Sequence, residues 1–133
     1  MSLFDFFKKD KVELTDKQLK HNKMWEMWAD EQTKPPYTEL MTYQSEVNNG
    51  GHAQYFSNTD DESDLQKEIS VLDSVLSEKL KNNLHEAYNA YLILEEKYDE
   101  YAEKTIERCD DAFFENEEQI NNILDEYESE LKI

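Results

Sequence analysis

The side chains best suited to catalysis or metal binding are few and widely separated in this chain. The three histidines are His21, His52 and His85, and the only cysteine is Cys109. Zinc sites draw their ligands from closely spaced Cys and His residues, and these four residues lack such spacing. The sequence therefore predicts no zinc site. Because Cys109 falls on an apolar helical stripe, we interpret it as a buried core thiol and not as a nucleophile.

Carboxylates are the abundant chemical group, since 32 of the 133 residues are Asp or Glu. The acid-rich stretch 58–64 lacks the central Gly and the final Glu of an EF-hand calcium loop. The chain contains no phosphate-binding glycine loop, dinucleotide fingerprint or nucleophile elbow. Among so many carboxylates, no single pair stands out as a general acid and base. The sequence predicts a protein that is not an enzyme, with no catalytic residue, metal or cofactor.

The net charge of −18 lies entirely after the Pro35-Pro36 pair. Residues 1–34 hold seven Lys and seven acids, whereas residues 35–133 hold 25 acids and only seven bases. A domain with this charge repels nucleic acids and membranes and attracts basic proteins. The charge pattern therefore favours an interaction protein whose partner is basic.

Part of this charge is predicted to form a row along one helix. If residues 84–113 are helical, the acids that face away from the apolar stripe follow each other at steps of 4, 3, 4 and 4: Glu96, Glu100, Glu103, Glu107 and Asp111. Side chains at such steps lie about 5–6 Å apart at their Cβ atoms, and one DNA strand carries a phosphate for every ~3.4 Å of rise. The row, with the adjacent Asp110, could copy a row of phosphates and bind a partner. It could equally be the solvated face of an acidic helix.

The elements that position these residues are predicted to be helices, because the chain has only two Gly and two Pro. We expect helices over 15–33, 38–47, 52–56, 63–76 and 78–114, and a last helix after residue 116. Residues 57–62 are expected to form a polar loop. Ser63 and Ser77 are predicted N-caps, a break is expected near Thr105, and Asn116 is predicted to cap the last helix. The predicted fold is all-α: one compact domain over residues 1–133, with about six to seven helices and a loosely docked segment 1–14.

Both glycines lie in the string Glu-Val-Asn-Asn-Gly-Gly-His-Ala-Gln-Tyr-Phe-Ser-Asn, residues 46–58. Glycine permits positive φ and close backbone approach, so we expect a corner between two helices. Tyr55 and Phe56 would anchor the short helix after this corner in the core. Gln54 and Asn58 are expected to hydrogen-bond the exposed backbone of the corner.

This string resembles the signature Glu-Val-x-Asn-Gly-Gly-x-x-Gln-Tyr-Phe-x-Asn of a bacterial helical domain family. A founding characterised member of that family is a dimeric DNA mimic that occupies the DNA-binding site of a transcription factor. The matching residues are Asn49, Gly50, Gly51, Gln54, Tyr55, Phe56 and Asn58. Residues 109–114 are similar to the C-terminal end of the family, so the resemblance spans residues 20–131. It implies the fold, whereas mimicry would depend on surface acids outside the motif.

The first hypothesis is an acidic DNA mimic that binds and blocks a basic DNA-binding protein, such as a transcriptional regulator. The second is an immunity or inhibitor protein against a basic nuclease or toxin. The third is a small hydrolase or ligand-binding domain with a pocket around Gln54, Tyr55 and Asn58, and the fourth is an acidic helical domain with no DNA-mimic role. The sequence shows no signal peptide or membrane span, so a cytoplasmic location is expected. The neutral segment with Trp25 and Trp28 could form a homodimer face or complete the core.

Overall fold

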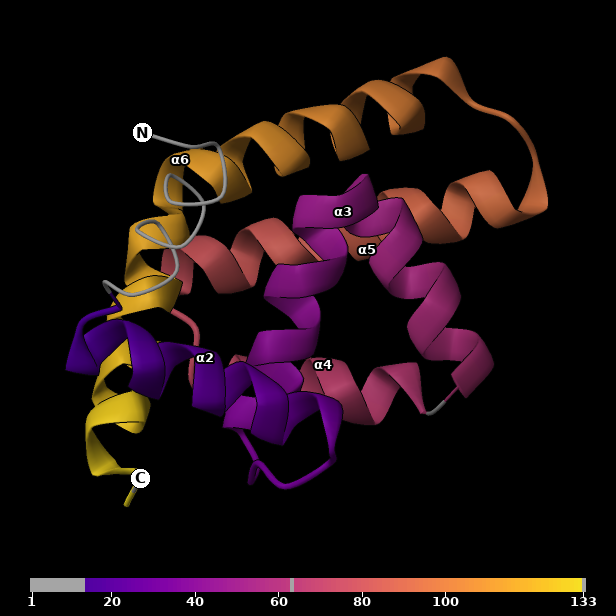
Figure 1. Cartoon of the computed structure of the whole chain (residues 1–133). Coiled ribbons are helices and arrows are strands. Elements are labelled where there is room, and N and C mark those ends of the chain that lie inside the picture. Colours follow the sequence, from indigo (N-terminus) through magenta and orange to yellow (C-terminus); the bar gives the residue numbers. More distant parts are fainter. Residues whose placement is uncertain (1–13, 63, 133) are drawn as a thin grey trace, which may run out of the picture.

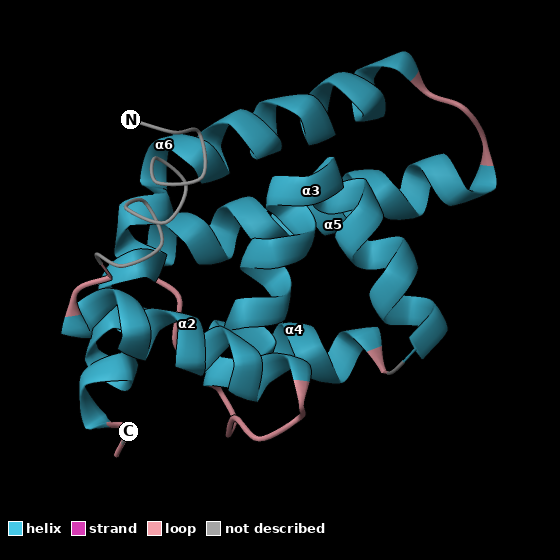
Figure 2. Ribbon diagram, in the orientation of Figure 1, coloured by secondary structure: helices cyan, strands magenta, loops and turns pink. Residues whose placement is uncertain are grey.

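The computed structural model describes residues 14–62 and 64–132, which form five α-helices and no strand (Figures 1 and 2). The helices are α2 (Asp16–Ala29), α3 (Tyr37–Glu62), α4 (Leu65–Asp73), α5 (Glu78–Glu96) and α6 (Glu100–Glu130). The predicted all-α class is confirmed, but the expected six to seven helices are too many for this part of the chain. The proposed docking segment 1–14 lies outside the described residues except for Leu14.

Several helix boundaries follow from local capping. Thr15 caps α2 by accepting a hydrogen bond from the Gln18 amide, and Ser77 caps α5 as predicted. Asp64 caps α4 by accepting from the Lys67 amide at 3.2 Å, whereas the predicted cap, residue 63, lies outside the described residues. Helix α2 ends at Ala29, earlier than the predicted residue 33, and Glu31 follows with a left-handed φ of 59°.

Three interruptions expected from the sequence do not exist. Residues 57–62 continue α3 instead of forming a loop, and α6 runs unbroken from residue 100 to residue 130. Within α6, the Thr105 hydroxyl donates to the Tyr101 carbonyl at 2.9 Å, and the Asn116 amide donates to the Ala112 carbonyl at 2.7 Å. Both bonds reach back one turn inside the helix, so these polar side chains are accommodated without ending it.

The break comes instead at residues 97–99, which separate α5 from α6. Asp99 caps α6 by accepting from the Ala102 amide at 2.9 Å. Helices α5 and α6 then run back along each other as an antiparallel hairpin (Figure 1). Tyr98 lies in this connection with 68% of its surface exposed. The helical stretch expected over residues 78–114 is therefore interrupted at 97–99 and not near Thr105.

The core is centred on the kinked α3, which packs against α4, α5 and α6. Its largest fully buried side chains are Tyr43, Tyr55 and Phe56 from α3 and Phe113 from α6. Helix α2 contributes a single fully buried residue, Met24, while its two tryptophans are half-buried against the core. Helix α2 therefore covers an edge of the bundle and leaves part of the surface of α3 and α6 open beside it.

Candidate functional site

The glycine pair turns the chain within α3 and brings it against α6. Gly51 has φ 78° and ψ −179°, a backbone region that is essentially restricted to glycine. A Cβ atom at Gly51 would lie 2.5 Å from a carboxylate oxygen of Asp110. A Cβ at Gly50 would collide with the Gln54 side chain, 1.9 Å away. The corner therefore requires glycine both for its conformation and for the close approach of α3 to α6.

A series of hydrogen bonds through the buried His52 side chain connects this corner to α6. The backbone amide of His52 donates to Asp110 Oδ1 at 2.8 Å, and His52 Nδ1 lies 2.6 Å from the same oxygen. On the other side of the ring, His52 Nε2 lies 2.6 Å from the Tyr43 hydroxyl. Burial, the largest cause, raises the pKa of Tyr43 well above its ordinary value, so this hydroxyl remains protonated and can donate to Nε2. His52 then donates from Nδ1 to Asp110, and all three side chains act as a structural unit.

The polar motif residues Gln54 and Asn58 form hydrogen bonds that differ from those predicted. Gln54 and Asn58 both donate to Glu46 Oε2, at 2.9 and 2.8 Å, instead of to the backbone of the corner. Tyr55 and Phe56 are fully buried, which confirms their predicted role as anchors. Because the corner is packed and internally bonded, the structure counts against the hypothesis of a ligand pocket there.

The predicted acidic row is only partly assembled on one helix. Glu96 is the last residue of α5, so the turn at 97–99 separates it from the others. The carboxylate of Asp110 points into the glycine corner, where it binds His52. The remaining members of the row share an exposed side of α6: Glu100, Glu103, Glu107 and Asp111.

Because α6 does not end at residue 114, the row continues further than the sequence predicted. Its next exposed acids are Glu115 and Glu118. We define the acidic face of α6 as the six exposed carboxylates between residues 100 and 118, which lie within about a third of the helix circumference: Glu100, Glu103, Glu107, Asp111, Glu115 and Glu118. With ~1.5 Å of rise per residue, the part from Glu103 to Glu118 extends for about 22 Å.

Little positive charge neutralises this face. Lys104 pairs with Glu100 at 3.2 Å, and both side chains are about 70% exposed, so this pair is weak in water. The Arg108 guanidinium instead contacts Glu86 on α5. No ion pair to Glu107 or Asp111 is formed within residues 14–62 and 64–132. The acidic face therefore keeps most of its charge.

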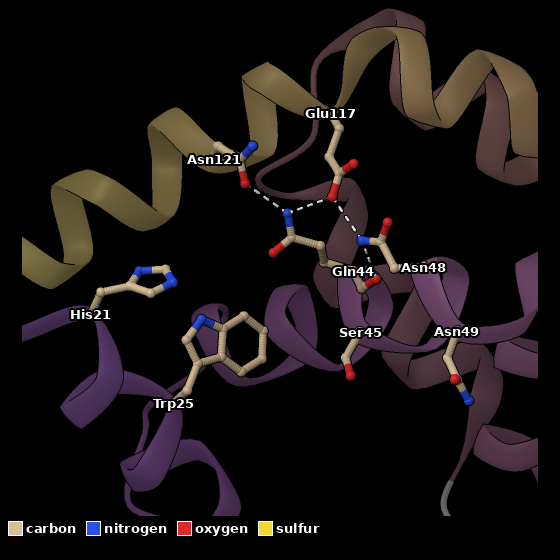
Figure 3. Close-up of a pocket in the computed structure, with 8 residues that line it drawn as sticks. All are labelled: His21, Trp25, Gln44, Ser45, Asn48, Asn49, Glu117 and Asn121. Atoms are coloured by element: carbon tan, nitrogen blue, oxygen red, sulfur yellow. Dashed lines mark hydrogen bonds between the residues drawn. The ribbon is translucent and has the colours of Figure 1, made fainter. Parts of the chain in front are cut away.

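A second feature is an open polar pocket of about 460 Å³ between α2, α3 and α6 (Figure 3). It is lined by His21, Trp25, Gln44, Ser45, Asn48, Asn49, Glu117 and Asn121. Gln44 Nε2 donates to Glu117 Oε2 at 2.9 Å and to Asn121 Oδ1 at 2.7 Å, and Asn48 Nδ2 donates to the same Glu117 oxygen at 2.7 Å. The sequence reasoning missed this pocket. Polar residues four apart on each helix, at 44 and 48 and at 117 and 121, were the available signal.

Cys109 is fully buried, as predicted, and burial raises the pKa of its thiol to about 11. Across the described ranges, no three His, Cys, Asp or Glu side chains are grouped so that they could hold a metal ion. None of the helices in these ranges is both long enough and apolar enough to cross a bilayer.

The fold and surface define an acidic, all-helical domain in which a glycine corner braces a long helix that presents carboxylates. Comparison with protein families matches residues 37–131 to DMP19-like protein, and the chain belongs to this family of DNA mimics. The match begins at the first residue of α3, so α2 lies outside it, although the sequence resemblance was expected to start near residue 20. No curated protein and no solved structure matches the chain.

Proposed function

We propose that this protein is a DNA mimic that acts by binding and not by catalysis, and that it blocks the DNA-binding surface of a basic protein such as a transcriptional regulator. The observation that carries the proposal is the acidic face of α6, whose carboxylates are exposed and largely without basic partners. Family membership supports the same role. The cytoplasmic location expected from the sequence stays a prediction, and a homodimer stays one of the two alternatives for the segment with Trp25 and Trp28.

The charge and spacing of α6 suit contact with a phosphate-binding surface. The helix carries twelve acids and two bases. From Glu103 to Glu118, successive carboxylates are separated by about 4.5–6 Å along the helix axis, somewhat wider than the ~3.4 Å of rise per phosphate in one DNA strand. Lys and Arg side chains that grip phosphates are long enough to bridge this difference. We therefore expect fast association that weakens steeply with salt.

The fold holds this face in place before a partner arrives. Helix α6 is fixed to α3 by the Asp110–His52 bonds and by buried residues such as Phe113 and Ile120. A rigid row of charges loses little conformational freedom on binding, which favours affinity.

The test begins with proteins captured from a lysate of the cells that encode the chain. A captured protein is identified, and its binding to duplex DNA is measured by fluorescence anisotropy with increasing amounts of the acidic protein. We expect the wild type to displace the DNA. A variant with Glu103, Glu107 and Asp111 changed to Lys should compete at least tenfold less well, since each change replaces an attraction by a repulsion.

The matched control changes Glu26, Asp30 and Glu31 to Lys, which alters the net charge equally at exposed positions before α3. It should compete like the wild type. If the α6 variant and the control compete equally well, the acidic face is not the binding surface. A captured nuclease or toxin that is inhibited without losing bound DNA would instead support the immunity hypothesis.

A further inference from the structure

In the pocket between α2, α3 and α6, the hydrogen bonds of Gln44 fix which end of its side-chain amide faces Glu117. Glu117 can only accept hydrogen bonds when ionised, so the Gln44 side chain must turn its NH₂ group toward it. The second N–H of that group is used by Asn121. Gln44 is only 7% exposed and cannot reorient freely. Its Oε1 has no partner among the described residues and points to the space bounded by His21, Trp25 and Asn121 (Figure 3).

The charge in the pocket is negative and uncompensated. Glu117 receives two amide hydrogen bonds but has no basic partner within the described ranges. The imidazole of His21 is bonded instead to the buried Glu128 at 2.9 Å, so any positive charge on His21 is balanced there. The whole chain carries a net charge of −18, and a negative field of this kind concentrates cations at a concave site.

One wall of the pocket is the indole ring of Trp25. Trp25 is half-buried beside Trp28, with ring centroids 5.3 Å apart in an edge-on arrangement, and lines the same pocket as Gln44. An indole ring attracts a cation placed over its face within about 6 Å of the centroid. A planar guanidinium can stack on the ring while its N–H groups donate to a carboxylate and an amide oxygen. An ammonium could use the charge but not the stacking.

We propose that this pocket binds a guanidinium group, the side chain of an arginine on the basic partner. This inference rests on the proposed function and adds an anchoring site to it. The pocket uses α2, which lies outside the region matched to the family, so this anchor depends on a part of the chain that the family match does not cover. The acidic face then supplies long-range attraction, and the pocket supplies a specific contact beside the same helix.

The first experiment uses N-acetyl-arginine amide as a probe and N-acetyl-citrulline amide as its neutral isostere. Binding to the full chain is followed by NMR through the side-chain amides of Gln44, Asn48 and Asn121 and the indole N–H of Trp25. We expect the arginine probe to shift these signals and the citrulline probe to leave them unchanged. Glu117→Gln, which keeps an acceptor but removes the charge, should weaken probe binding about tenfold or more. Glu126→Gln, at an exposed position of the same helix outside the acidic face, is the matched control and should bind like the wild type.

The second experiment measures the affinity of the captured partner for Glu117→Gln and for the control Glu126→Gln. A loss of at least fivefold confined to Glu117→Gln supports the arginine anchor. Equal shifts with the citrulline probe, or undiminished arginine binding by Glu117→Gln, would overturn it. Unchanged partner affinity despite specific probe binding would also overturn it, because the pocket would then serve a small free cation. The variant with Glu103, Glu107 and Asp111 changed to Lys separates the two proposals. If this variant loses the partner and Glu117→Gln does not, only the arginine anchor fails. If the arginine probe binds the pocket but no captured protein releases DNA, only the mimic proposal fails.

Discussion

Replacing Gly51 by alanine tests whether the glycine corner is required by conformation and by contact with Asp110. Alanine at φ 78° and ψ −179° would be strained by about 1–3 kcal/mol. Its Cβ would also lie 2.5 Å from an Asp110 oxygen, so the carboxylate must move away from His52. Losing hydrogen bonds to a charged group costs about 1.5–3 kcal/mol. We expect the free energy of unfolding to fall by about 3–5 kcal/mol in total.

The assay is urea unfolding followed by far-UV circular dichroism. With a slope of about 2 kcal/mol per molar urea, the midpoint of the Gly51→Ala variant should fall by about 1.5–2.5 M. Ala53→Gly, at an exposed helical position two residues later, is the matched control. It should cost only about 0.5–1 kcal/mol, the usual penalty for glycine inside a helix.

A double-mutant cycle separates strain from contact. In an Asp110→Ala background the carboxylate is gone, so Gly51→Ala should cost only the backbone strain of about 1–3 kcal/mol. If Gly51→Ala costs the same in both backgrounds, the approach of α3 to Asp110 is not what requires glycine. A cost below about 1 kcal/mol in the otherwise wild-type chain would refute the whole explanation.

Three further predictions concern the same buried region. Tyr43→Phe should lower the free energy of unfolding by about 1–3 kcal/mol in urea titrations, because His52 Nε2 loses its buried partner. Asp110→Asn should destabilise the fold by about 1.5–3 kcal/mol, whereas Asp111→Asn should change the urea midpoint little, since only Asp110 bonds to His52. For Cys109, the folded pKa of about 11 lies above the ordinary value of 9.0, so its contribution to stability is complete below pH 9 and is lost as the pH rises to 11. A urea midpoint that stays constant between pH 8.5 and 11 would contradict that assignment.

Much of the helical architecture could be predicted because it follows from local interactions. Ser77 caps the helix that it was expected to cap, the first helix starts at the expected residues, and the scarcity of Gly and Pro predicted the all-α class. Whether a helix ends near residues 97–99, 105 or 116 could not be predicted from the sequence. There the outcome depended on whether polar side chains bond inside a helix, as Thr105 and Asn116 do, or cap a new one, as Asp99 does.

The acidic surface was predictable in amount but only partly in position. The charge and the spacing from Glu100 to Asp111 are properties of the sequence, because a helical wheel needs only residue numbers. The wheel placed Glu96 on the wrong helix and stopped before Glu115 and Glu118, since it depended on boundaries that the sequence did not show. The polar pairs at 44 and 48 and at 117 and 121 were visible in the sequence, but the pocket that they line could not be placed, because its walls come from three helices.

By itself, the sequence determined that this protein is helical, strongly acidic after residue 34 and bent at a glycine pair. The tertiary structure alone decided between two adjacent aspartates, since Asp110 turns inward to His52 and Asp111 faces water. Successive helical residues point about 100° apart, and which direction is inward depends on a packing partner 58 positions away in the chain. Charge and helix propensity are properties of each residue, whereas the partner of a carboxylate is set by how the helices pack.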